Sequence, residues 1–200
     1  MTTNIILAGV GGQGILSIAT VLGTAALKEN LFLKQSEVHG MSQRGGDVQS
    51  NLRISDKPIS SDLIPYRKAD LVISLEPMEA LRYLPYLSKT GVVVTNTTPY
   101  VNIDNYPDVK QLMLQLEKVG NLVAYDMDEV ARQIGSPRSS NMVLLGSASI
   151  FLKIEQEVLE NSIREVFSSK GDKIIDLNIK AFAAGREFAS QNYRETIASF

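Results

Sequence analysis

The sequence predicts a single α/β domain over residues 1–200, with a mostly parallel sheet flanked by helices and a helical C-terminal third. Three observations carry this prediction: short apolar runs that end in glycine or polar residues, helical apolar spacing between them, and purely helical patterns after Asp126. At 200 residues the chain can bury one substantial core, and its 44% apolar and 21% charged residues are ordinary for a globular protein.

The first quarter of the chain alternates strands and helices. Residues 4–10 form an apolar run typical of a buried strand, and residues 13–29 carry apolar side chains at helical spacing. A short strand around 31–37 completes a strand–helix–strand unit. Residues 47–55 alternate between apolar and polar side chains, which predicts a half-buried strand antiparallel to a neighbour.

The remaining elements follow from the same two periodicities. Further strands are predicted over 69–75, 91–97 and 121–127, with helices over 76–87 and 108–120 between them. The C-terminal third is predicted to form helices over 126–135, 141–154, 155–167 and 178–192. Because residues 141–154 are apolar almost all round, that helix is expected to be buried in this chain or against a partner.

The composition excludes several classes of function. Without cysteine the chain has no thiolate nucleophile and no cysteine-ligated metal or iron–sulfur cluster, and its single histidine excludes a multi-histidine metal site. A net charge of -2 without a basic cluster argues against nucleic acid. No apolar run approaches the roughly 20 residues of a membrane span, and the N-terminus lacks a secretory signal, so we expect a cytoplasmic protein.

The segment GVGGQG places Gly9, Gly11 and Gly14 in the G-x-G-x-x-G pattern, between a predicted strand and a predicted helix. Glycines there allow a tight turn, and the helix N-terminus offers N–H groups and a partial positive charge to a phosphate. In a Rossmann-like dinucleotide fold an acidic residue ends the second strand, and Glu37 lies near that position. The alternatives are a phosphate from another ligand and a turn that serves helix packing alone.

The loop EVHGMSQRGG, residues 37–46, is expected beside the glycine loop if the second strand ends near Glu37. Arg44 can then clamp a phosphate or carboxylate, and His39 can donate to an anion or exchange a proton. The alternatives are a structural hydrogen bond for His39 and an ion pair of Arg44 with Glu37 or Asp47. The polar face of the next strand (Gln49, Asn51, Arg53) is expected to be solvated or to form a subunit interface.

A third cluster is SPRSSNMVLLG, residues 136–146. Ser139 or Ser140 can cap the next helix, and Arg138 adds a positive charge at the N-terminus of that helix. An anion site and ordinary capping explain the cluster equally well. Glu76, followed by Pro77, either faces the ligand crevice or starts a helix.

Five segments follow one another in the order and spacing of one family: GVGGQG, SEVHGMSQRGG, EPMEALRYLPYL, SPRSSNMVLLG and NIKAFAAGRE. The chain resembles the beta subunits of indolepyruvate ferredoxin oxidoreductases, which are similar to the gamma subunits of 2-oxoacid:ferredoxin oxidoreductases. The resemblance spans about residues 4 to 190, and EVHGMSQRGG is its most specific part.

The resemblance implies a function for the assembled enzyme. It implies oxidative decarboxylation of an aryl 2-oxoacid to its acyl-CoA, with electrons passed to ferredoxin. Thiamine diphosphate and 4Fe–4S clusters are implied in a larger partner subunit, coenzyme A is implied as a substrate near the interface, and no cofactor is implied for this chain alone. A homodimer is a further possibility, with the apolar helix from residue 141 as one candidate surface.

Carried onto this sequence, the resemblance implies binding roles without covalent chemistry. The matching residues are Gly9, Gly11, Gly12, Gln13 and Gly14 in the first block, His39, Gly40, Ser42, Gln43, Arg44, Gly45 and Gly46 in the second, and Asn141 and Gly146 in the third. His39 and Arg44 are the candidates for a role at the reacting groups. Two other hypotheses remain: a stand-alone dinucleotide-binding regulator that uses Glu37, and an interaction protein whose glycine loop binds nothing.

Overall fold

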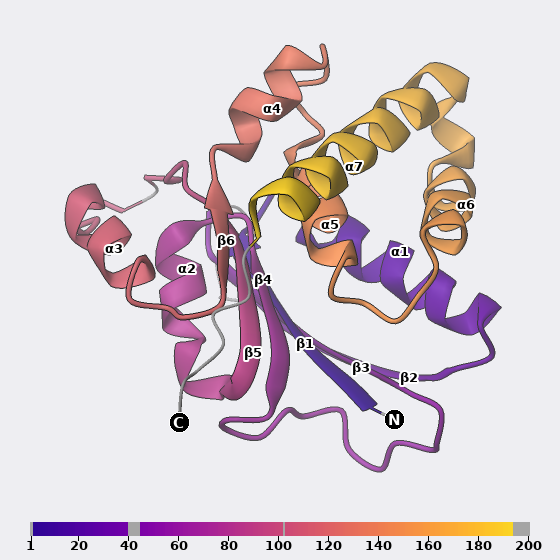
Figure 1. Cartoon of the computed structure of the whole chain (residues 1–200), viewed down its shortest axis with the longest axis horizontal. Helices are drawn as coiled ribbons and strands as arrows, with labels where there is room; N and C mark the ends of the chain where they lie inside the picture. Colours follow the sequence, from indigo (N-terminus) through magenta and orange to yellow (C-terminus); the bar gives the residue numbers. More distant parts are fainter. Residues whose placement is uncertain (1, 40–44, 102, 194–200) are drawn as a thin grey trace.

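The computed structural model describes residues 2–39, 45–101 and 103–193, with the side chain of His39 left out. Six strands in this part of the chain form one sheet with helices on both sides (Figure 1). The strands are β1 (Thr2–Val10), β2 (Phe32–His39), β3 (Asp47–Ser55), β4 (Ala69–Ser74), β5 (Leu87–Asn96) and β6 (Leu122–Tyr125). The helices are α1 (Ile15–Lys28), α2 (Pro77–Arg82), α3 (Val109–Leu116), α4 (Met127–Gln133), α5 (Ser140–Ser149), α6 (Gln156–Val166) and α7 (Asp172–Asn192). The predicted α/β fold with a helical C-terminal third is confirmed.

The sheet has the strand order β2-β3-β1-β4-β5-β6. Strands β1, β4, β5 and β6 are parallel, whereas β3 runs antiparallel to both β1 and β2. The antiparallel strand predicted at 47–55 is therefore confirmed, and it lies between the first two strands. The predicted strand–helix–strand unit is present, but β1 and β2 are not neighbours, because the nine-residue β3 occupies the position beside β1.

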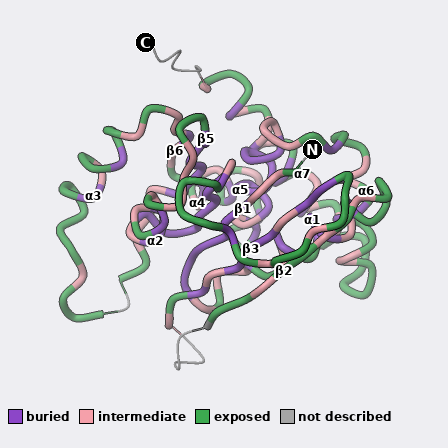
Figure 2. The backbone as a smooth tube through the Cα atoms, turned by 90° about the horizontal axis from the view of Figure 1, so that it is seen from below, coloured by how far each residue is buried: buried purple, intermediate pink, exposed green. Residues whose placement is uncertain are grey.

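Two apolar layers hold the sheet between its helices. Residues such as Ile5 and Leu7 face α1, α5, α6 and α7, and the alternate residues Ile6 and Ala8 face α2 and α3. Figure 2 shows buried residues gathered along the central strands and the helix faces turned toward them. β1 is thus buried on both faces, as expected for a central strand of a mostly parallel sheet.

Helices α5 and α7 cross at backbone contact. A Cβ atom added to Gly146 would lie 1.9 Å from the carbonyl oxygen of Phe182, and one added to Gly185 would lie 1.9 Å from that of Val143. The Ser147 hydroxyl lies between the helices, 3.1 Å from the Gly185 carbonyl oxygen. The helix predicted from residue 141 is therefore buried within this chain, so it does not supply a partner surface. Gly146, matched to the family through its motif, is a packing residue.

Some element boundaries differ from the predicted ones. The helix predicted over 76–87 ends at Arg82 and is followed by a short 3-10 turn at Leu84–Tyr86, because Pro85 cannot continue an α-helix. Helix α3 ends at Leu116, before the predicted Gly120, and α7 begins at Asp172, before the predicted residue 178. Within the described ranges, no helix is long and apolar enough to span a membrane.

Candidate functional site

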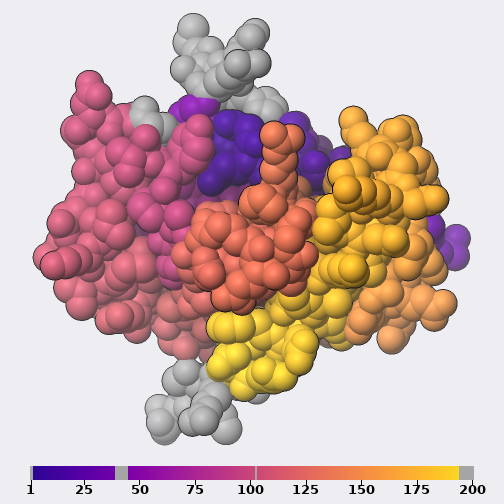
Figure 3. All heavy atoms as spheres, turned by 90° about the horizontal axis from the view of Figure 1, so that it is seen from above, coloured from indigo at the N-terminus to yellow at the C-terminus, as the bar shows by residue number. Residues whose placement is uncertain are grey.

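A cavity of about 540 Å³ opens where the parallel strands end. Its lining comes from the glycine loop, from the segment before α5 and from the ends of β4 and β5: Gly12, Gln13, Gly14, Leu75, Asn96, Tyr100, Asp128, Pro137, Arg138, Ser140 and Asn141. Figure 3 views the molecule from this side, where the indigo N-terminal atoms lie close to orange atoms from far along the chain. The structure thus joins the first and third sequence clusters in one site.

Gly14 and Asn141 meet at the floor of this cavity. Gly14 is the residue before α1 and has a left-handed backbone with φ +88°, which favours glycine. A Cβ atom there would lie 2.7 Å from Asn141 Nδ2, and this amide donates a hydrogen bond of 3.4 Å to the Gly14 carbonyl oxygen. The two residues are 127 positions apart, and the contact joins the N-termini of α1 and α5.

Gln13 holds the glycine loop in place. Its Oε1 accepts a hydrogen bond of 2.7 Å from the Val10 N–H, and its Nε2 donates one of 3.2 Å to the Leu75 carbonyl oxygen. The side chain therefore ties the ends of β1 and β4 together. Although the family motif predicts a binding role for Gln13, both polar atoms of its side chain are engaged in the fold.

Replacing Gln13 with methionine is expected to cost about 2 kcal/mol of unfolding free energy, because two partly buried backbone groups lose their partners. Denaturant unfolding of the full chain measures this loss. Gln191→Met is the matched control, because within the described part of the chain its amide donates to Glu187 on the exposed surface, and it should stay within about 0.5 kcal/mol of wild type. Equal effects of the two changes would contradict the structural role of Gln13.

The N-terminus of α5 faces the same cavity without a serine cap. Ser139 occupies the capping position, but its side chain caps nothing; it pairs with Ser136 at 2.6 Å and donates to Asn178. The Ser140 hydroxyl donates to Asp128. The prediction that these serines cap the helix is therefore wrong, since tertiary partners take both hydroxyl groups.

The electrostatics of the cavity favour an anion. The N-termini of α1 and α5 contribute partial positive charge, and the exposed Arg138 adds a full one. Asp128 is the opposing charge, but its two carboxylate oxygens accept from Ser140 and from Asn96 Nδ2, the latter at 3.0 Å. The resulting site suits a phosphate or carboxylate whose ligand also carries polar groups.

Sequence reasoning missed four lining residues: Leu75, Asn96, Tyr100 and Asp128. Asn96 ends β5, and its Oδ1 accepts from the Met127 N–H at 3.0 Å. The signal that could have found Asn96 and Asp128 is their position at or just after the carboxyl ends of predicted parallel strands, where such sheets bind ligands. Tyr100 has no comparable sequence signal.

The returning end of the loop at 37–46 lies where the sequence predicts. The Gly11 N–H donates a hydrogen bond of 2.9 Å to the Gly46 carbonyl oxygen, so the returning end contacts the glycine loop. Gly45 directly precedes Gly46 in the chain and has a left-handed backbone with φ +77°. The predicted residues Gly40, Ser42, Gln43 and Arg44 lie outside the described residues, and so does the side chain of His39.

Glu37 does not lie where a dinucleotide fold needs it. It is on β2, two strands from β1 and thus about 10 Å away across the sheet, and it accepts a hydrogen bond of 2.6 Å from Gln35. The prediction that it lies beside the glycine loop is wrong, because β3 separates the two strands.

The polar face of β3 serves the fold. Arg53 donates to Asn4 Oδ1 at 2.9 Å and to the carbonyl oxygens of Ser61 and Leu63. Asn51 is buried and donates to Ser36. The expected solvation is wrong for Asn51, which is buried, whereas Arg53 is half-buried; a subunit interface on this face stays a prediction.

Glu76 starts α2 and is fully buried. Its carboxylate accepts from the Glu79 N–H at 2.9 Å and from the Tyr106 hydroxyl. Burial, followed by this hydrogen bond, raises the pKa of Tyr106 above its ordinary value. The helix-start alternative is confirmed.

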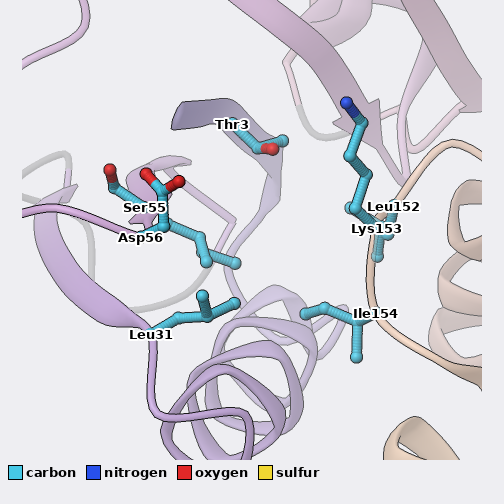
Figure 4. Close-up of a pocket in the computed structure, with 8 residues that line it drawn as sticks. Thr3, Leu31, Ser55, Asp56, Leu152, Lys153 and Ile154 are labelled. Carbon is cyan, nitrogen blue, oxygen red and sulfur yellow. The ribbon is translucent and has the colours of Figure 1, made fainter. Parts of the chain in front are cut away.

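A smaller cavity of about 150 Å³ lies at the opposite end of the strands (Figure 4). Apolar side chains such as Leu31 and Ile154 form much of it, and Thr3, Ser55, Asp56 and Lys153 supply polar groups. No residue predicted for function from the sequence lines this cavity, so the candidate site is the one at the carboxyl ends.

An α/β fold with a cavity at the carboxyl ends of its parallel strands places this chain among the open α/β-sheet domains, which as a class bind their ligands at that edge. Residues 4–188 match the family described as pyruvate ferredoxin/flavodoxin oxidoreductase, and the chain belongs to this family. The resemblance identified from the sequence motifs is thereby confirmed.

Relatives and solved structures agree with this assignment. The indolepyruvate oxidoreductase subunit IorB of Methanothermobacter thermautotrophicus is 37% identical to this chain, over 96% of this chain and 100% of the relative. The protein of the same name from Pyrococcus horikoshii is also 37% identical, over 94% of this chain and 96% of the relative. The gamma subunit of a keto/oxoacid ferredoxin oxidoreductase from Geobacter sulfurreducens has the same fold, with a TM-score of 0.72 and 24% identity over 97% of this chain and 99% of that chain.

A larger enzyme contains the same fold as one part. The 2-oxoglutarate:ferredoxin oxidoreductase from Magnetococcus marinus, solved with 2-oxoglutarate, coenzyme A and succinyl-CoA bound, superimposes with a TM-score of 0.75. The match has 23% identity and covers 95% of this chain but 31% of that one. This chain is thus homologous to subunits of 2-oxoacid:ferredoxin oxidoreductases.

Proposed function

We propose that this chain is the cluster-free subunit of an indolepyruvate or aryl pyruvate:ferredoxin oxidoreductase, which oxidatively decarboxylates its 2-oxoacid to the acyl-CoA. The observation that carries this proposal is the 37% identity to proteins named indolepyruvate oxidoreductase subunit IorB along nearly the full length of both chains. The isolated chain is expected to be inactive, because it contributes binding groups rather than a redox centre.

The cofactors divide between the subunits in this proposal. The cysteine-free chain has no thiolate ligand for a 4Fe–4S cluster, so the clusters, with thiamine diphosphate, belong to the larger partner subunit. Coenzyme A would approach near the interface, where it supplies the thiol that accepts the acyl group. The cavity fits one of its phosphates, which Arg138 and the N-terminal ends of α1 and α5 would hold.

The remaining assignments extend the same proposal. His39 and Arg44 stay the candidates for a role at the reacting groups, and Ser42, Gln43 and Gly45 stay candidates for binding. Residues 1–200 act as one domain in the cytoplasm, bound to the larger subunit and through it to ferredoxin, with a homodimer as an additional state. The adjacency of the loop end to the glycine loop supports a shared ligand-facing surface.

The first experiment is to purify the chain with its partners from native extract and to measure ferredoxin reduction with indolepyruvate, phenylpyruvate and pyruvate. Recovery of a larger cysteine-rich subunit and coenzyme A-dependent activity on the aryl substrates is expected. A chain that purifies alone and binds a nicotinamide or flavin dinucleotide at micromolar concentration would support the regulator hypothesis instead.

In the reconstituted enzyme, Arg138→Ala is expected to raise the KM for coenzyme A about 10-fold with little change in kcat, since a charge-assisted hydrogen bond contributes about 1.5 kcal/mol. Arg132→Ala is the matched control, because this exposed arginine pairs with Glu129 and does not line the cavity. Arg44→Ala is expected to lower turnover or to raise the coenzyme A requirement. Full activity of both the Arg138 and Arg44 variants would support the alternative hypothesis, in which the glycine loop serves helix packing and binds no ligand.

A further inference from the structure

Among the described residues, β2 is an outer strand of the sheet. It is eight residues long, contains neither proline nor glycine, and pairs with β3 in an unbroken register from Phe32↔Ser55 to His39↔Val48. The opposite edge strand, β6, has four residues. Proteins usually protect an edge strand by keeping it short, bulged or interrupted by proline, or by placing charges on it; β2 lacks the first three protections and carries the charges of Lys34 and Glu37.

Exposed apolar side chains accompany this edge strand. Phe32 is 47% exposed and Val38 is 55% exposed. They lie on the same face of the strand, because side chains alternate and the two residues are six positions apart. Lys34, Gln35 and Glu37 are exposed as well, and Figure 2 shows β2 along the rim of the molecule in the colours of exposed and half-buried residues.

We propose that β2 pairs antiparallel with β2 of a second copy of this chain, about a two-fold axis that lies midway between the two copies of Gln35. The pairing would join two six-stranded sheets into one continuous sheet. Closed two-fold dimers are the commonest oligomers of soluble proteins, and addition of a strand to a sheet edge forms main-chain hydrogen bonds along that edge.

The side chains of β2 select this register. A two-fold axis perpendicular to the sheet keeps each face of one sheet continuous with the same face of the other. Opposed residues must therefore point to the same face, so the axis lies midway between the two copies of one residue. With Gln35 on the axis, Phe32 lies opposite Val38 of the second copy, and the pair occurs twice. Aromatic and β-branched residues form favourable cross-strand pairs.

The neighbouring registers are less favourable. An axis at Lys34 or at Glu37 sets two like charges directly opposite each other, which destabilises a strand pair. With the axis at Ser36, Lys34 lies opposite Val38 of the second copy. Phe32 then no longer faces Val38, so the apolar pair is lost. Of these four positions, Gln35 alone pairs the exposed apolar side chains and keeps like charges from facing each other.

A single cysteine tests the register, because the chain has none of its own. In Gln35→Cys the two thiols would lie on directly opposed residues, with Cα atoms about 4.5–5.5 Å apart, within the range of a disulfide. In the matched control Glu37→Cys the two residues are offset by four positions, about 13 Å. Mild oxidation of the full-length chain should give a covalent dimer for Gln35→Cys and a monomer for Glu37→Cys.

Sedimentation of cysteine-free variants provides a second measurement. The wild-type chain should sediment as a dimer, and Phe32→Lys with Val38→Lys should raise the dimer dissociation constant at least 10-fold. Leu114→Lys, at a comparably exposed apolar residue on α3, should leave it unchanged.

A monomeric wild type, no cross-link for Gln35→Cys, or equal cross-linking of both cysteine variants would overturn the proposal. So would loss of the Gln35→Cys cross-link when the larger subunit is bound, since that subunit would then cover the edge. None of these outcomes bears on the cavity or on ferredoxin reduction, so the proposed function is tested separately.

Discussion

Replacing Gly146 or Gly185 with alanine is expected to lower the free energy of unfolding by about 3 kcal/mol. The sign is the reverse of the usual effect, since alanine normally stabilises a helix interior by about 0.5–1 kcal/mol relative to glycine. Here the added methyl group would lie 1.9 Å from a carbonyl oxygen of the facing helix. The two helices would have to separate, and the packing between α5 and α7 would be lost.

Denaturant unfolding of both variants checks this expectation. Gly120→Ala is the control, because a Cβ atom there meets nothing within 4 Å, and its stability should stay within about 0.5 kcal/mol of wild type. Stability of Gly146→Ala and Gly185→Ala at or above that of the control would show that the helices are not in backbone contact.

Replacing Glu76 with alanine is expected to cost about 3 kcal/mol. The change removes a helix cap, typically worth about 1 kcal/mol, and leaves the half-buried Tyr106 hydroxyl without its acceptor, at about 1–3 kcal/mol more. Asp108→Ala is the control. Asp108 caps α3 in the same way, at 3.0 Å from the Gln111 N–H, but the bond is exposed, so about 1 kcal/mol is expected. Equal losses would remove the distinction between the buried and the exposed cap.

The Tyr106–Glu76 contact also predicts a pH dependence. Because the pKa of Tyr106 is raised in the folded chain, the contact stabilises the fold below the unfolded pKa of about 10, and this stability is lost as pH rises through the folded-state pKa. The difference in unfolding free energy between wild type and Tyr106→Phe should therefore be constant from pH 7 to about 9 and shrink at higher pH. A difference that grows above pH 10 would contradict the raised pKa.

The elements of this fold were predictable because their periodicities are strong. The apolar run at 4–10, the alternation at 47–55 and the nearly uniform apolar segment from residue 141 all have the predicted type, and the first and third also have the predicted burial. Strand order was not predictable in the same way, because the position of β3 beside β1 depends on which edges pair. The misplacement of Glu37 follows from that single missing fact.

The candidate site was predictable in parts and not as a whole. The glycine loop and the cluster around Asn141 each carry a local signal, but their contact across 127 residues is a tertiary fact. The prediction of serine caps was wrong for the same reason. Asn178 and Asp128, which come from other parts of the chain, accept the hydrogen bonds of the Ser139 and Ser140 hydroxyl groups. The Gln13 amide looks like a ligand contact in the motif, yet the neighbouring strand ends take both of its polar atoms.

The meeting of Gly14 with Asn141 makes the shape of the cavity depend on the docking of the C-terminal helices. One wall of the cavity belongs to the glycine loop, and the other is carried by α5, which α7 holds in place. An anion that needs both walls binds the docked state and not the opened one, so by mass action it stabilises docking by RT ln(1 + [L]/Kd), about 2.7 kcal/mol at a hundredfold excess over Kd. Reciprocally, any substitution that loosens the α5–α7 crossing weakens binding from a distance, without touching a ligand.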